Sequence, residues 1–292
     1  MVAHTRVRST LAAMALVVGL GAVGGALPAL AATASSTADA SLNAPVVATV
    51  EDAVLFDEDG ITITAKGLEQ GSRSTDLKLV IENNTDTTFT VQCRNVSVNG
   101  YMVDALMSTE VAAGKKAIDT MMLYTSSLET CGIETIADIE LSFHVFASDG
   151  WDTIVDTPQI QIQTSAYDGY VYEFDDTGEV LFEGEGITIV LKGLDEEASF
   201  MGPGVVFYIQ NDSEHDITVQ VRNESVNGFM VPGSMSCDIM AGKRAIDDVT
   251  FYSSKLEESY IDAIETVELS FHIFSQQGWD TIVDTDLIEM VF

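Results

Sequence analysis

Stretches in which apolar and polar residues alternate with a period of two recur along the chain after about residue 49. In residues 61–66 and 76–81 most apolar side chains occupy every second position. Such alternation is typical of a β-strand with one face buried and one face wet. The segments 83–86 and 211–214 are rich in Asn, Asp, Ser and Thr, which favour turns. We therefore predict a series of short strands joined by turns.

Two local irregularities refine this pattern. The Asn99-Gly100 pair, between two strand-like segments, predicts a tight two-residue hairpin because both residues tolerate positive φ. A few residues earlier the alternation slips by one position, which predicts a β-bulge near Arg94 and Asn95.

The whole pattern occurs twice. RNVSVNGY at 94–101 recurs as RNESVNGF at 222–229, an offset of 222 minus 94, or 128 residues. LSFHVF at 141–146 and WDTIVDT at 151–157 recur at the same offset. Near the start of each copy the offset is 126, so copy two has two extra residues, which we place in a loop within 199–204. We predict two tandem domains, 49–165 and 166–292, each large enough for its own core.

One segment in each copy interrupts the strand pattern. Residues 126–129 read Ser-Ser-Leu-Glu and residues 254–257 read Ser-Lys-Leu-Glu, and both fit a helix capping box. We predict a single helical turn there, crossing between sheets before the strand that carries Phe143 or Phe271. About seven strands and one such crossing per copy predict an all-β fold of two tandem immunoglobulin-like antiparallel sandwiches.

The N-terminus has the pattern of a secretory signal peptide. Two arginines precede an apolar run, and Ala29-Leu30-Ala31 fits a small-x-small cleavage site. We predict a signal peptide over 1–31 and a flexible Ala/Ser/Thr-rich spacer over 32–48. An uncleaved membrane anchor is the alternative interpretation of the apolar run. After cleavage we expect no membrane insertion, and a protein that is secreted or loosely associated with the cell surface.

The chain is strongly acidic, with a formal net charge of −33 and a pI near 4.1. A polyanion repels phosphate backbones and anionic membrane surfaces, so we expect no nucleic-acid partner. The acidity serves solubility or a specific cation or basic partner.

The phrases RNVSVNGYMV, GKKAID, ELSFHVF and WDTIVDT resemble exported bacterial domains of unknown function. Those domains are similar to the immunoglobulin-like sandwich of mycobacterial immunoprotective secreted antigens. The resemblance covers both copies. It implies the fold and an extracellular setting, and it implies no activity, because that family has no assigned catalytic residues.

The three cysteines are Cys93, Cys131 and Cys237. The positions equivalent to the first two lack a thiol in copy two, and this joint loss predicts a disulfide between Cys93 and Cys131. Two unpaired thiols are the alternative. The odd Cys237 is either buried or a link between two chains.

No catalytic or metal-binding set stands out. His144 and His272 occupy the same place in an alternating strand, as polar strand residues, and no His/Cys spacing fits zinc. The acidic turns 57–60 and 175–178 lack the remaining ligands of an EF-hand, so we interpret them as hairpin turns. Calcium bound at a domain junction stays open; no other cofactor is expected.

Two repeated aromatic positions and one repeated arginine have two interpretations each. Trp151 and Trp279 either plug one end of the sandwich or form an exposed binding tip, together with Tyr101 and Phe229. In the second interpretation, these four aromatic residues are candidates for binding a glycan, provided that they lie exposed beside polar groups. The repeated arginine, Arg94 and Arg222, either forms an internal ion pair, with Asp119 or Asp247 as the suggested partner, or captures an anion.

The sequence has no Gly-x-Ser-x-Gly motif and no phosphate-binding loop between a strand and a helix, so we expect no enzyme. The function predicted is a secreted or surface-associated, non-catalytic binding or adhesion module, with an extracellular protein or a glycan as partner. A calcium-stabilised extracellular spacer is the alternative.

Overall fold

A computed structural model describes residues 48–292. The signal peptide predicted for 1–31 and the spacer predicted for 32–48, apart from Ala48, lie outside the described residues. The described residues belong to one compact unit. None of the helices within 48–292 has the length and apolar character needed to cross a membrane.

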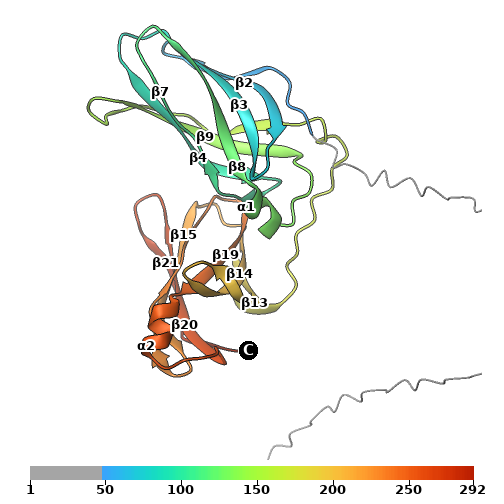
Figure 1. The fold of residues 1–292 in the computed structure, drawn as a ribbon, viewed down its shortest axis with the longest axis vertical. Coiled ribbons are helices and arrows are strands. Elements are labelled where there is room, and N and C mark those ends of the chain that lie inside the picture. Colours follow the sequence, from blue (N-terminus) through green and yellow to red (C-terminus); the bar gives the residue numbers. More distant parts are fainter. Residues whose placement is uncertain (1–47) are drawn as a thin grey trace, which may run out of the picture. The chain divides into compact units, whose positions relative to one another are not determined.

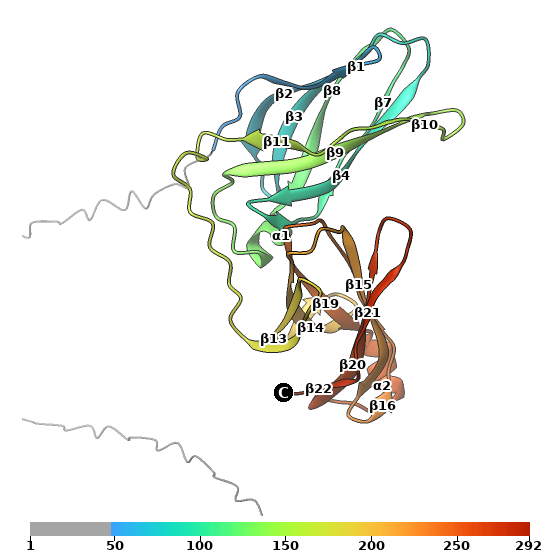
Figure 2. The same ribbon diagram turned by 180° about the vertical axis from the view of Figure 1, so that it is seen from behind.

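Copy one, the first repeat, forms two facing sheets, which Figures 1 and 2 show from opposite sides. The first has the order β1-β2-β3-β8-β6, and the second is built on β4 and β9, with β5 and β7 paired to β4 and with β10 and β11 paired to β9. The elements are β1 (Ala53–Glu58), β2 (Ile61–Gln70), β3 (Ser74–Asn83), β4 (Phe89–Val98), β5 (Tyr101–Met102), β6 (Ala105–Leu106), β7 (Ser108–Val111), β8 (Lys116–Tyr124), α1 (Thr125–Thr130), β9 (Asp138–Ala147), β10 (Thr153–Asp156) and β11 (Ile160–Gln163).

Copy two repeats this arrangement. One sheet contains β12-β13-β14-β19 with β17 on β19, and the other is built on β15 and β20. A single parallel bridge between Tyr101 of β5 and Arg244 of β19 joins sheets of the two copies. The elements are β12 (Glu179–Gly184), β13 (Ile187–Ser199), β14 (Gly202–Asn211), β15 (Ile217–Val226), β16 (Phe229–Met230), β17 (Gly233–Ser234), β18 (Ser236–Ile239), β19 (Arg244–Phe251), α2 (Ser253–Glu258), β20 (Thr266–Ser275), β21 (Thr281–Asp284) and β22 (Ile288–Val291).

The strand order is that of an immunoglobulin-type sandwich. In copy one β2-β3-β8-β6 corresponds to strands A-B-E-D, and β4-β9-β10 corresponds to C-F-G. In copy two the same positions are held by β13-β14-β19-β17 and β15-β20-β21. The predicted fold class is confirmed: the chain is all-β, with antiparallel sandwiches and one short helix in each copy. The division between residues 165 and 166 stays a prediction.

The alternating apolar residues face inward, as predicted. Ile61 and Ile63 of β2 and Leu79 of β3 have no exposed surface, and they belong to a hydrophobic cluster drawn from residues 50–162. A second cluster is drawn mostly from residues 187–290. Each fully buried aliphatic side chain contributes about 1.5–3 kcal/mol relative to exposure, so these two clusters stabilise the sandwiches.

The predicted hairpin and bulge are both confirmed. Asn99 and Gly100 have φ of 49° and 83°, as a type I′ turn requires. On β4 the register passes from Arg94 opposite Ser142 to Ser97 opposite Glu140, so β4 has one extra residue there. That residue bends the strand where the outward alternation ends.

The helical turns occur where predicted, but their caps differ from the prediction. α1 begins at Thr125 after Tyr124, and no side chain caps it, so the capping box at 126–129 is wrong. The helix begins one residue before Ser126, so this serine lies inside the first turn and not at the N-cap, which Tyr124 occupies. The next residue, Ser127, accepts a hydrogen bond through its Oγ from the backbone N–H of Asp104, at 2.9 Å.

Candidate functional site

Most outward side chains of the second sheet are the same in both copies, with differences at its margins such as Glu110 against Asp238. β4, β9 and their neighbours present residues that alternate with the core positions and point away from the hydrophobic cluster. We call this set the repeated face. Its pairs are Thr90/Thr218, Gln92/Gln220, Arg94/Arg222, Ser108/Ser236, Ser142/Ser270, His144/His272, Phe146/Phe274, Trp151/Trp279 and Asp156/Asp284.

The core is conserved only in part. Leu77, Leu79 and Phe89 of copy one are Val, Phe and Ile in copy two, whereas Leu141 and Phe143 are unchanged. Packing constrains core residues, but exposed polar residues on a sheet contribute little to stability. Identity of the exposed members of the repeated face therefore points to a role other than folding.

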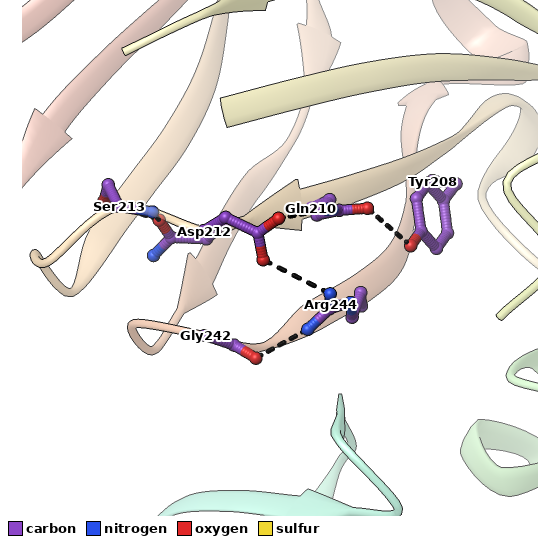
Figure 3. A network of polar contacts seen from close by, with 7 residues as sticks. Tyr208, Gln210, Asp212, Ser213, Gly242 and Arg244 are labelled. Carbon is purple, nitrogen blue, oxygen red and sulfur yellow. Dashed lines mark hydrogen bonds and ion pairs between the residues drawn. The ribbon is translucent and has the colours of Figure 1, made fainter. Parts of the chain in front are cut away.

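The outer surface of the opposite sheet shows the same contrast. Lys116 of copy one forms an ion pair with Glu82, with 2.7 Å between Nζ and Oε2. The equivalent residues in copy two are Arg244 and Gln210, and the network differs (Figure 3). There the Arg244 guanidinium donates to the Asp212 carboxylate at 3.2 Å and to the Gly242 carbonyl at 2.7 Å. The residues and contacts of this surface therefore differ between the copies, whereas those listed for the repeated face are the same.

Three aromatic rings stack in series on the repeated face. In copy one the rings of His144 and Phe146 lie 5.2 Å apart, and the rings of Phe146 and Trp151 lie 5.2 Å apart with an interplanar angle of 13°. In copy two the corresponding distances are 5.1 and 5.6 Å. The histidine and phenylalanine are buried, so the indole is held on a rigid base.

The tryptophans themselves are exposed. Trp151 and Trp279 retain 75% and 74% of their accessible surface. Of the two interpretations from sequence, the structure places both indoles outside the core rather than as plugs of the sandwich end. Both also have positive φ, 61° and 63°, which costs a side-chain-bearing residue on the order of 1–2 kcal/mol. A glycine would relieve this strain, yet both copies have tryptophan there.

Charged groups surround the stack. The His144 Nδ1 lies 2.5 Å from the Asp156 carboxylate, and the His272 Nδ1 lies 2.6 Å from the Asp284 carboxylate. The Arg222 Nη1 lies 3.8 Å from the same Asp284 oxygen. The arginine of copy two therefore has an internal carboxylate partner on this face.

The internal ion pair expected for the repeated arginine occurs in copy two, where Arg222 pairs with Asp284, but neither suggested aspartate, Asp119 or Asp247, takes part in an ion pair within 48–292. Asp119, the suggested partner in copy one, accepts a hydrogen bond from the Thr109 hydroxyl at 2.5 Å. Within 48–292, Arg94 forms no ion pair with a carboxylate. Asp119 lies on the inward side of β8, toward the facing sheet, whereas Arg94 points outward from β4. The two side chains therefore lie on opposite sides of the second sheet.

The four-residue binding tip predicted from sequence does not form. The β4–β9 register pairs Phe89 with Ala147 and Val98 with Ile139, so the turn carrying Trp151 lies at one end of β4 and Tyr101 beyond the other. That length of strand spans about 30 Å.

Tyr101 and Phe229 also differ from each other in burial. Tyr101 is 4% exposed and packs edge-on against Phe174, 5.3 Å between centroids, and burial raises the pKa of its hydroxyl to about 12. Phe229 is 55% exposed. A shared tip would need both rings exposed and near the indoles.

The predicted disulfide is also absent from the structure. Cys93, Cys131 and Cys237 are free thiols. Cys93 packs against the core of copy one, whereas Cys131 packs against the cluster of Tyr101 and Tyr208, so the two thiols have different surroundings. Burial raises the pKa of each thiol, that of Cys131 to about 12, which disfavours the reactive thiolate.

The acidic turns contain no metal site in the part of the chain that the structure describes. No group of three or more His, Cys, Asp or Glu residues there could hold a metal ion. The turn at 57–60 connects β1 and β2. At the other turn the Asp175 carboxylate accepts hydrogen bonds from Thr177 and lies 3.0 Å from the Lys192 ammonium, and these contacts lower its pKa to about 2.

Tryptophan emission checks the exposure directly. The chain has only two tryptophans, so the emission reports on Trp151 and Trp279 alone. We expect a red-shifted emission that acrylamide quenches nearly as well as it quenches free tryptophan. Emission that is blue-shifted and protected from the quencher would contradict the exposed stack.

Comparisons with known proteins give little further guidance. No family model matches the chain. A search of curated proteins finds no match. Among solved structures, the crystal structure of the YadV chaperone aligns over 74% of this chain and 92% of its own, with 8% identity and a TM-score of 0.22. A likeness this weak carries no conclusion, so the proposal for function rests on the repeated face alone.

Proposed function

We propose that the chain is a secreted or surface-associated, non-catalytic binding module of the adhesion type, and that the repeated face contacts its ligand. The observation that carries this proposal is the recurrence of the repeated face in both copies. Surface substitutions away from special features change stability by about 0.5 kcal/mol or less, so folding alone would not preserve the exposed members of this face, such as Gln92, Arg94 and Ser108. Binding of the same ligand by both copies would preserve them.

Two properties of the face support binding rather than catalysis. Its indole is exposed and pre-stacked, in a strained backbone conformation kept in both copies. Its polar groups lie on a sheet surface, where they can hydrogen-bond a ligand laid across the strands. Two equivalent sites on one chain also increase the overall affinity for a multivalent ligand through effective concentration.

Alanine substitution of the two indoles tests the proposal. The full mature chain is applied to a glycan array and to an array of extracellular proteins, beside Trp151→Ala, Trp279→Ala and the double variant. We expect the wild-type chain to bind at least one ligand, each single variant to bind it about 10- to 100-fold more weakly through lost avidity, and the double variant to show no binding.

The matched control removes an exposed aromatic side chain that lies outside the repeated face of both copies. Phe200, 98% exposed in the loop of the two extra residues, has no counterpart in copy one. Phe200→Ala should bind like the wild-type chain. The proposal fails if the wild-type chain binds nothing on either array, or if the double tryptophan variant binds as well as Phe200→Ala.

A further inference from the structure

We propose that the repeated face binds a neutral glycan, with one sugar ring stacked on Trp151 and one on Trp279. This inference rests on the proposed function and names the chemical class of its ligand. It is carried by three properties of the face: a single flat indole, polar groups beside its ring stack, and the local excess of carboxylates.

The indole is the apolar element of the site. Trp151 exposes one side of its flat ring, and Phe146 covers the other side. The next ring in the stack is that of His144, which is buried, so the indole is the exposed apolar group of the stack. A pyranose ring has a comparable flat patch of C–H groups on one side. Because the indole is already fixed, stacking a ring on it costs little side-chain entropy.

Hydrogen-bonding groups of both kinds lie around the histidine at the other end of the stack from the indole. Gln92, Arg94 and Asp156 lie on β4 and β10, opposite or next to the histidine that supports the stack. Together they supply donors and acceptors for a ligand rich in hydroxyl groups. The centre of a protein–protein interface is instead more apolar, and charged residues are depleted there. The polar composition of this face therefore favours a sugar over a protein partner.

The charge selects against acidic polymers. Asp149, Asp152 and Asp156 are exposed near Trp151, while Arg94 is the basic residue of that face, and the chain as a whole carries a formal charge of −33. Coulomb repulsion therefore opposes sulfated or carboxylated chains at physiological salt, within a Debye length of about 8 Å. A neutral chain has no such penalty.

The test uses the tryptophan emission as a direct readout of both sites. The mature chain is titrated with soluble β-glucan, galactomannan, mannan, dextran and arabinogalactan, and with heparin as the acidic polymer. We expect at least one neutral polymer to give a saturable blue shift, because stacking removes water from the indole, and heparin to give none. The same polymer should shift the emission of Phe200→Ala to the same extent.

A variant that keeps both tryptophans separates recognition from non-specific stacking. Gln92→Ala combined with Gln220→Ala removes one amide from each site, and we expect binding roughly tenfold weaker with an unchanged thermal unfolding curve. The inference is overturned if no neutral polymer shifts the emission, if heparin shifts it more strongly, or if the glutamine variant binds like wild type. A protein ligand that is lost with the tryptophans would overturn the glycan while leaving the proposed function intact.

Discussion

Replacing Asn99 by alanine is expected to lower the free energy of unfolding by about 4 kcal/mol. The Asn99 side chain is 3% exposed; its Nδ2 donates to the Thr135 carbonyl at 2.7 Å and to the Tyr170 hydroxyl at 2.9 Å. Its Oδ1 accepts the backbone N–H groups of Ala137 and Asp138 at 2.8 and 3.2 Å. Each buried group left unpaired costs about 1–3 kcal/mol, and alanine at φ 49° adds about 1 kcal/mol more.

Asn227 provides the matched control for this substitution. It occupies the same hairpin position and accepts the N–H groups of Glu265 and Thr266 at 2.8 and 2.9 Å, but it is half-buried, so water can replace part of what is lost. Urea unfolding followed by backbone circular dichroism should show a clearly smaller loss for Asn227→Ala. If Asn99→Ala lowered the free energy of unfolding by less than about 1 kcal/mol, the buried hydrogen bonds of Asn99 would not stabilise its hairpin as argued.

Stability is expected to fall as pH rises from about 4 to 6 because of Asp247. Burial raises the pKa of this carboxyl from the ordinary 3.8 to about 6, although the carboxylate accepts the Asp248 N–H and lies beside the Cys237 thiol. Between these two values the folded state binds more protons than the unfolded state. Raising the pH through that window therefore removes stability on the order of 3 kcal/mol, and the loss is complete above about 6.

Asp247→Asn isolates this contribution. The amide keeps the acceptor that Asp248 uses and removes the buried charge, so the variant should be more stable than wild type at pH 7.5 and should lose the decrease between pH 4 and 6. The exposed Asp238→Asn is the control, and it should change neither. Equal stability of Asp247→Asn and wild type at pH 7.5, measured by urea unfolding, would contradict the burial argument.

Local patterns in the sequence predicted most of the fold. Period-two alternation, the Asn99-Gly100 turn and the bulge near Asn95 each depend on a few neighbouring residues, and all three occur in the structure. The helix cap failed because the helix begins at Thr125, so Ser126 lies in its first turn rather than at the N-cap. A four-residue pattern indicates that a helix begins nearby, but the rest of the fold decides at which residue it begins.

The candidate site was predicted in part. The exposed tryptophans were one of two sequence interpretations, but their grouping with Tyr101 and Phe229 required the strand register to be known. The repeated face was missed, although a signal for it was present: outward polar positions such as Gln92 and Ser108 are identical in both copies, although core packing does not constrain them. Comparing the copies position by position, with inward and outward residues separated, would have found it.

The exposure of both indoles has a practical consequence for studying the folding of this chain. Trp151 and Trp279 are about three-quarters accessible in the native state, so denaturation changes their solvent environment little. A denaturation curve recorded by indole emission should therefore be nearly flat while the sandwiches melt. The buried Tyr208 and the backbone are the spectroscopic reporters of that transition.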